Sequence, residues 1–388
     1  MDEILQRLNH GSTEDRLSEL RAVIASESEK PVALPQFANN HIHTFYSFSP
    51  YSPTSAVYYA RKAGLQTAGI MDHDSIAGAR EFIEAGKIAG VATTIGLECR
   101  VSVAGTPLEG RRINNPDQKS VAYMALHGVP HGKIDMLQNV FKPLRDKRNL
   151  RNIKMVNNIN AIVEPFGITL DFEYDVLPLS HFYEGGSVTE RHIIFALCKK
   201  IISLAGVDGT ADFVENKMGV PLSAKQKEQL TDKANPYFEY DLLGVLKAQF
   251  VGKIYVDATD ECLHISELAA LAKDTGALLC YAYLGDVGDS VTGDKKTQKF
   301  EDDYLDLLFD VLQSNGIDAV TYMPSRNTPE QLTRIQNMCR ERGISEISGE
   351  DINSPRQKFI CEQLEQPQFR HLIDATWNLI RRENELSK

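Results

Sequence analysis

Histidines and acidic residues recur at the ends of apolar segments within the first hundred residues. His41 and His43 stand two positions apart at the end of one such segment, so both side chains leave the same face of a strand. The sequence Asp-His-Asp at 72–74 follows a second apolar segment, and Glu98 ends a third. A His-x-His pair alone is more often a polar strand end than a metal site. Together with carboxylates at neighbouring strand ends, it predicts a catalytic metal centre.

The composition limits the classes of protein to which the chain can belong. With 388 residues and 42% hydrophobic side chains, the chain can bury a sizeable core. No apolar stretch reaches the length of a membrane span, and the acidic start at 1–8 lacks the apolar part of a signal peptide, so we expect a cytoplasmic protein. The net charge of −11 disfavours general nucleic-acid binding. Six cysteines without a Cys-x-x-Cys pair argue against a disulfide framework or a cysteine zinc site.

Strand and helix patterns alternate along most of the chain, which predicts a parallel sheet closed into a barrel. Seven segments have strand character: 37–42, 67–71, 94–103, 120–126, 277–283, 317–323 and 344–348. Helical patterns occupy 54–63, 76–89, 261–274, 300–314 and 329–342. The polar residues of interest all follow strands, which is where such barrels carry their functional groups.

The gap between the fourth and fifth predicted strands is too long for a simple crossover and is mostly helical in pattern. We therefore predict a helical subdomain inserted into the barrel. The beginning of this insertion is basic, a feature typical of an exposed helix face, with steering of an anionic substrate as the alternative. The predicted division of the chain is an N-terminal helical extension, the first barrel part, the insertion, the second barrel part and a helical tail: 1–35, 36–132, 133–256, 257–355 and 356–388.

Four motifs resemble those of the PHP (polymerase and histidinol phosphatase) family of metal-dependent phosphoesterases. They are His-Ile-His-Thr-Phe-Tyr-Ser at 41–47, Asp-His-Asp at 72–74, Gly-Leu-Glu at 96–98 and the closing Gly-Glu-Asp-Ile-Asn at 349–353. The resemblance covers the barrel half of the chain and implies an α/β fold, a distorted seven-stranded (β/α)7 TIM-like barrel. It also implies a first divalent cation held by four residues, and a second one shared by Glu98 with His127. The four ligands of the first cation are His41, His43, Glu98 and Asp351.

Three positions depart from the family's ligand pattern. Phe48, Tyr283 and Asn353 stand where the family usually has a histidine or an acidic residue. We therefore expect one firmly held metal ion, a weaker second one and no regular third. Zinc, manganese and iron all suit mixed imidazole and carboxylate ligands. Residues that could replace the missing ligands or contact substrate are Tyr283, Asp286, His192, Asn353 and Asp74.

The predicted reaction is hydrolysis of a phosphomonoester or phosphodiester by metal-activated water, with nucleotides and oligonucleotides among the conceivable substrates. His73 and Asp72 are the predicted catalytic residues, with His73 free to orient substrate or carry a proton. We expect a small phosphorylated substrate and no membrane partner; the oligomeric state is left open. Candidates for phosphate binding are Arg326, Lys295, Lys296 and Arg191.

Two other functions fit the same residues. The altered ligand set suits a domain that binds a metal ion or a nucleotide without turnover. A His-x-His metal pair also occurs in amidohydrolase-like barrels that act on carbon–nitrogen bonds. The Asp-His-Asp turn and the early Glu98 favour the phosphoesterase.

Overall fold

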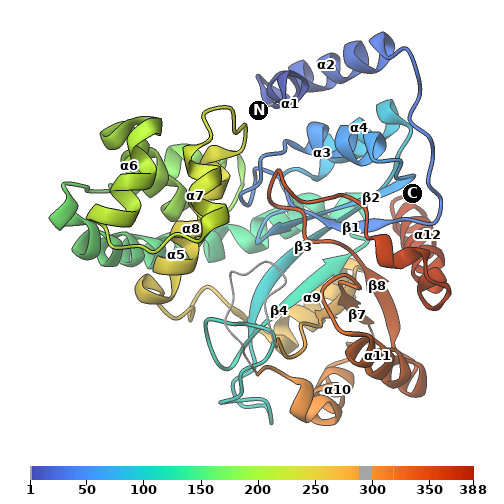
Figure 1. Cartoon of the computed structure of the whole chain (residues 1–388). Coiled ribbons are helices and arrows are strands. Elements are labelled where there is room, and N and C mark those ends of the chain that lie inside the picture. Colours follow the sequence, from blue (N-terminus) through green and yellow to red (C-terminus); the bar gives the residue numbers. More distant parts are fainter. Residues whose placement is uncertain (1, 288–298, 318) are drawn as a thin grey trace.

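The computed structural model describes residues 2–287, 299–317 and 319–388, and it shows a curled sheet surrounded by helices (Figure 1). The main sheet has the strand order β1-β2-β3-β4-β6-β7-β8, and the short β5 pairs with β3. The strands are β1 (Asn39–Ile42), β2 (Thr67–His73), β3 (Ala92–Ser102), β4 (Val121–His127), β5 (Leu263–His264), β6 (Leu278–Ala282), β7 (Ala319–Tyr322) and β8 (Ser345–Ser348). The α-helices are α1 (Glu3–Asn9), α2 (Thr13–Ser26), α3 (Pro53–Lys62), α4 (Ala79–Ala89), α5 (Ile134–Val163), α6 (Glu190–Asp212), α7 (Ala224–Thr231), α8 (Phe238–Ile254), α9 (Ile265–Thr275), α10 (Leu305–Ser314), α11 (Pro329–Arg342) and α12 (Arg370–Leu386).

The seven strands of this path match the predicted strands, and the TIM-like barrel is confirmed. The prediction of an all-parallel sheet was wrong, because β4 runs antiparallel to both β3 and β6. No crossover helix separates β3 from β4: residues 103–120 form a loop whose ends meet, with the Val103 N–H donating to the Ser120 carbonyl, so the chain turns back beside β3 as in a hairpin. The register pairs Glu98 with Ala125 and Arg100 with Tyr123. His127 therefore lies deeper in the barrel than Glu98, while Tyr123 lies nearer its mouth.

The barrel closes through a short contact between β1 and the segment after β8. The backbone N–H of His43 donates to the carbonyl of Ile352 over 2.9 Å, and the N–H of Ile352 donates to the carbonyl of His41 over 3.1 Å. This isolated parallel bridge replaces a full strand pair. It also fixes the neighbouring Asp351 beside the two histidines.

The terminal helices pack on the outside of the barrel. Helix α2 begins with a capping box formed by Ser12 and Asp15, and it lies over α4 (Figure 1). Arg16 binds the carboxylate of Glu81 within this interface, where both side chains are buried. At the other terminus, Glu383 of α12 accepts hydrogen bonds from the Thr94 hydroxyl and the Ile95 N–H of β3.

Helices α5 to α8 gather on one side of the barrel and enclose a hydrophobic cluster of their own (Figure 1). The expectation of an exposed basic face on α5 was wrong for its arginines. Arg145, Arg148 and Arg151 are only 4–5% exposed, whereas Lys142 and Lys154 are exposed. The arginines point toward the barrel because acidic residues there neutralise their charge.

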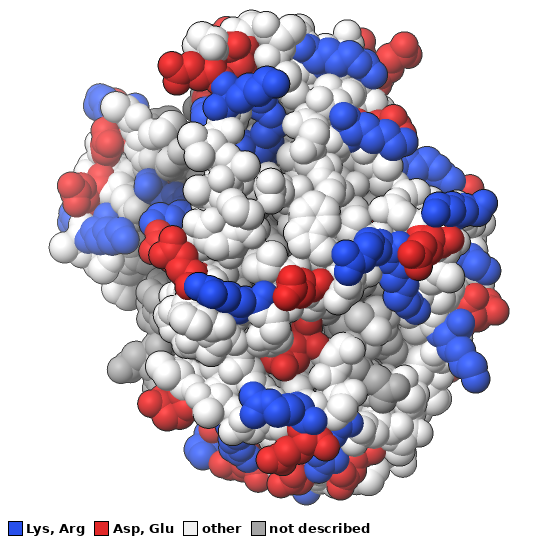
Figure 2. All heavy atoms as spheres, turned by 90° about the vertical axis from the view of Figure 1, so that its right-hand side faces the viewer, with Lys and Arg blue, Asp and Glu red and all other residues white. Residues whose placement is uncertain are grey.

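Figure 2 shows the side of the molecule that lies on the right in Figure 1, away from the inserted helices. Basic and acidic side chains are interspersed on this side. Within the part of the chain that the structure describes, no helix is both long and apolar enough to cross a bilayer.

Candidate metal centre

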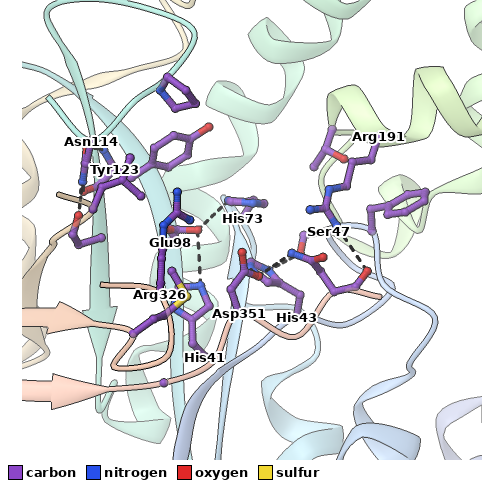
Figure 3. A pocket seen from close by; sticks show the side chains of 18 of the residues that line it. His41, His43, Ser47, His73, Glu98, Asn114, Tyr123, Arg191, Arg326 and Asp351 are labelled. Atoms are coloured by element: carbon purple, nitrogen blue, oxygen red, sulfur yellow. Dashed lines mark hydrogen bonds and ion pairs between the residues drawn. The ribbon is translucent and has the colours of Figure 1, made fainter. Parts of the chain in front are cut away.

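Ligand atoms from two histidines and a glutamate converge at the mouth of the barrel (Figure 3). His41 and His43 come from the end of β1, and Glu98 comes from the middle of β3. One ligand atom from each of these three residues lies within 4.8 Å of the other two. All three residues are buried, so their donor atoms face one another rather than bulk solvent.

The distances between these donor atoms suit a shared cation. His41 Nε2 lies 3.7 Å from Glu98 Oε2, which is too long for a hydrogen bond. Two donors that each lie about 2.1 Å from a tetrahedrally coordinated ion are about 3.4 Å apart, close to this separation. Asp351 approaches from the closing bridge, with its Oδ1 at 3.1 Å from His43 Nε2. The residues present therefore fit a divalent cation.

The protonation states also favour a cation. Burial by itself would raise the pKa of Glu98, but the nearby His41 ring and the charges of the neighbouring histidines lower it to about 2. Burial opposes ionisation of Asp351 too, yet the charge of His43 and its hydrogen bond hold the pKa of that carboxyl well below its usual range. Both carboxyl groups are thus ionised at neutral pH, which is the form that binds metal ions.

His127 lies inside the barrel beneath Glu98. Its Nε2 is buried and has no hydrogen-bond partner among the described residues. Burial lowers the pKa of His127 to about 3, so the imidazole is neutral and its lone pair is available. A buried polar nitrogen without a partner costs free energy, and a cation shared with Glu98 would satisfy it.

A hydrogen-bonded chain behind His43 fixes the orientation of its ring. The Ser47 hydroxyl lies 3.1 Å from His43 Nδ1 and donates to Asp72 Oδ1 over 2.6 Å. Asp72 also accepts from the N–H and the hydroxyl of Thr44. With Nδ1 engaged, the Nε2 of His43 faces the cavity. Asp72, predicted as catalytic, does not line the cavity and instead helps to position the side chain of His43 through Ser47.

His73 lies beside the carboxylate of Glu98, and its Nδ1 is 3.2 Å from Glu98 Oε2. Its ring centroid is 4.7 Å from that of His43. Burial lowers the pKa of His73 to about 3, so this imidazole is neutral. The side chain lines the cavity, and its position allows contact with a substrate.

The cavity above these residues has a volume of about 220 Å³ and carries three cationic side chains on its wall. Arg191 comes from the start of α6, Lys247 from α8 and Arg326 from the loop after β7. Lys247 could not be predicted from the sequence, because no motif surrounds it and only the docking of α8 brings it to the cavity. The predicted phosphate ligands Lys295 and Lys296 lie outside the described residues.

Phe48 occupies the position of one missing family ligand; it borders the cavity, but its ring is part of the core of the inserted helices. Its backbone has a φ of +84°, and its ring packs into the hydrophobic cluster of the inserted helices. There the ring centroid lies 5.0 Å from that of His192. His192 in turn accepts a hydrogen bond from the Thr189 N–H through Nδ1 and does not line the cavity. Both residues therefore serve the junction between barrel and insertion.

The other replacement candidates are also engaged with protein groups. The Tyr283 hydroxyl donates to Asp302 over 2.6 Å, and burial raises the pKa of this phenol above its ordinary value, so Tyr283 is no phenolate ligand. Asp286 accepts from the N–H of Phe300 and does not line the cavity. The Asn353 side-chain amide donates to Asp351 Oδ1 over 2.6 Å and thereby helps to orient that carboxylate.

Asp74 faces the insertion instead of the metal centre. Its carboxylate binds the guanidinium of Arg148, and its carbonyl accepts from Arg145 over 2.9 Å. Arg148 and Arg151 also bind Glu190, the residue that precedes Arg191 at the start of α6. The basic start of the insertion is therefore used in a buried ion-pair network at the cavity wall.

The chain belongs to the PHP domain family, whose model matches residues 39–308. A curated relative, the error-prone DNA polymerase of Nocardia farcinica, is 35% identical over 91 residues. That match covers 22% of this chain and only 8% of the polymerase, so the chain corresponds to a small part of that protein.

Two solved structures share the fold. One is described as a metal-dependent phosphoesterase from Bifidobacterium adolescentis; it superposes with a TM-score of 0.57 at 19% identity and covers 91% of this chain and 98% of that one. The other is an amidohydrolase from Chromobacterium violaceum with bound sulfate and no metal; its TM-score is 0.54 at 15% identity, covering 87% of this chain and 96% of that one. At these identities the likeness establishes the architecture alone.

Proposed function

We propose that this protein is a metal-dependent hydrolase that cleaves a phosphomonoester or a phosphodiester. The observation that carries the proposal is the convergence of His41, His43 and Glu98 within 4.8 Å at a cavity whose wall bears three cationic side chains. A divalent cation bound there supplies Lewis-acid stabilisation of the phosphoryl group and acidifies an attacking water. Asp351 would complete its ligands, and Glu98 with His127 would hold a second ion.

The side chains of the protein bind and orient the substrate. Arg191 and Arg326 present planar guanidinium groups that match the oxygens of a phosphoryl group, and Lys247 adds a third positive charge. Because Glu98 engages His73 through Nδ1, the Nε2 of that ring is left for the substrate. The neutral His73 can accept a proton at Nε2 or orient a substrate oxygen through it.

The decisive experiment is an activity screen of the purified protein with added Mn²⁺ or Zn²⁺. The panel contains phosphomonoesters, phosphodiesters and amides, and the His41→Ala variant is assayed beside the wild type. His371→Ala serves as the matched control, because this histidine lies on α12, outside the cavity, and contacts Glu346. We expect phosphoester hydrolysis that is lost in His41→Ala and retained in His371→Ala.

The same screen separates the other two functions. Binding of metal without hydrolysis of any substrate favours the binding module, which is motivated by Phe48 and Asn353 at family ligand positions. Hydrolysis of amides alone favours an amidohydrolase-like activity. Either result overturns the phosphoesterase.

A further inference from the structure

Tyr123 lies on the cavity wall on the opposite side of the ligand group from Arg191 (Figure 3). It stands on β4 two residues from Ala125, which pairs with Glu98, so its side chain leaves the same face of the sheet as Glu98. Its ring centroid is 5.9 Å from that of His73. Figure 3 shows its hydroxyl directed away from the strand and into the cavity.

The Tyr123 hydroxyl differs from those of the other tyrosines around β6 and β7. The hydroxyls of Tyr281, Tyr283 and Tyr322 each donate to a carboxylate of the protein: Glu301, Asp302 and Glu346, respectively. Among the described residues, the Tyr123 hydroxyl has no such partner. A phenol that projects into a cavity without a protein acceptor is available to a bound ligand.

The backbone of Tyr123 is held in place by Asn114. Pairing between β4 and β6 begins at Met124, so Tyr123 lies just beyond the end of that ladder. The Asn114 side chain bonds to both the N–H and the carbonyl of Tyr123 over 2.8 Å, and it donates to the carbonyl of Ala282 on β6 over 2.6 Å. A single amide thus ties Tyr123 to the next strand, which gives the phenol the fixed position that a catalytic donor requires.

The surroundings also keep Tyr123 a hydrogen-bond donor. The guanidinium carbon of Arg100 lies 6.0 Å from the ring centroid, on the face of the ring. Burial raises the pKa of the Tyr123 phenol above its ordinary value, although the charge of Arg100 opposes this shift. The phenol therefore stays protonated at neutral pH.

We propose that the Tyr123 hydroxyl donates a hydrogen bond to the leaving-group oxygen of the phosphoester. This inference rests on the proposed function and adds a catalytic residue to it. The cationic Arg191 suits the charged phosphoryl oxygens, whereas a neutral donor across the cavity suits an ester oxygen that gains negative charge only as its bond to phosphorus breaks.

The test uses substituted phenyl phosphates with Mn²⁺, from 4-nitrophenyl phosphate to unsubstituted phenyl phosphate. A donor to the leaving oxygen matters most for the poorest leaving group. We expect Tyr123→Phe to lower kcat/KM for phenyl phosphate by about 10²-fold, the usual cost of one transition-state donor, and to affect 4-nitrophenyl phosphate far less. The matched control is Tyr322→Phe, whose hydroxyl faces Glu346 and whose loss leaves the dependence on the leaving group unchanged.

Inhibition by inorganic phosphate supplies a second readout, because this ion has no leaving group. Its inhibition constant stays unchanged in Tyr123→Phe if the hydroxyl contacts the leaving oxygen. An equal loss for all substrates, or weaker inhibition by phosphate in Tyr123→Phe, overturns the assignment while the phosphoesterase stands. Absence of hydrolysis by the wild-type protein overturns both.

Discussion

The end of β1 and the loop after it contribute residues to two regions with different roles. Where β1 ends, His41 and His43 turn donor atoms toward Glu98 and form a polar centre in a cavity. A few residues later, Phe48 enters the hydrophobic cluster of the inserted helices beside His192. The first region groups side chains that could hold a metal ion, whereas in the second a side chain packs between the barrel and the insertion.

His43 and His192 differ in whether a ring nitrogen is left facing the cavity. The Nδ1 of His43 contacts the Ser47 hydroxyl, and its Nε2 faces Asp351. The Nδ1 of His192 accepts a hydrogen bond from the Thr189 N–H at the start of its own helix, and the ring packs against Phe48. The following substitutions test this contrast, beginning with the largest expected effect.

Glu98→Gln removes the charge shared by the ligand group but keeps the shape of the side chain. We expect metal affinity and kcat/KM to fall by more than the roughly 10–100-fold that the loss of an outer contact costs, because an amide is a poor ligand for these cations. Calorimetric titration with Mn²⁺ and steady-state kinetics measure the two losses. Glu362→Gln, which removes an exposed partner of Lys358, is the control. Unchanged metal affinity in Glu98→Gln would contradict the site.

Phe48→His restores an imidazole at the altered family position. The side chain still faces the inserted helices, so we expect no additional bound metal and a loss of about 3 kcal/mol in the free energy of unfolding. The loss follows from replacing ring contacts with Phe195 and Tyr240 by a buried polar group. Denaturant unfolding and metal analysis check the result. If Phe48→His bound one extra metal ion per chain and its free energy of unfolding were unchanged, the contrast between the two regions would be wrong.

Ser47→Ala breaks the link between His43 and Asp72 without touching a ligand. We expect metal affinity to fall about 10-fold, since the imidazole loses the contact that fixes its orientation. Titration with Zn²⁺ measures the change. Ser180→Ala removes a hydroxyl that caps a turn in the insertion and should leave the affinity as it is. Equal affinities for both variants would leave Asp72 without its positioning role.

His192→Gln tests whether His192 is buried in its neutral form, through the pH dependence of the free energy of unfolding. Burial lowers the pKa of His192 to about 3 from the ordinary value of 6.5. Below pH 6.5 the unfolded chain therefore binds a proton that the folded chain does not, and stability falls as the pH drops from 6.5 toward 3. At pH 5.5 protonation of His192 in the unfolded chain lowers the free energy of unfolding by about 1.4 kcal/mol.

Glutamine preserves the capping position of residue 192 and cannot be protonated. The difference in unfolding free energy between pH 7.5 and pH 5.5 should shrink by about 1.4 kcal/mol in His192→Gln. Urea unfolding at both pH values measures it. The same pH sensitivity in variant and wild type would mean that His192 is not buried in its neutral form.

Much of the fold could be predicted from local patterns. The strands were found within a few residues, and α11 begins and ends at the predicted positions, because Thr328 and Pro329 start the helix and Gly343 ends it. The direction of β4 could not be predicted, since the pattern of a strand is the same in either direction. The burial of Arg145 and Arg148 was also missed, because Asp74, whose carbonyl binds Arg145 and whose carboxylate binds Arg148, lies far away in the sequence.

The sequence by itself identified the candidate ligand group, because His41 and His43 are spaced to leave one face of a strand and Glu98 lies in a neighbouring apolar strand. Only the tertiary structure decided what surrounds it. The antiparallel path of β4 brings Tyr123 to the cavity, and the docking of the inserted helices brings Lys247 and Arg191 while it turns Phe48 and His192 into core. Periodicity is a local property of the chain, whereas these placements depend on contacts between residues far apart in it.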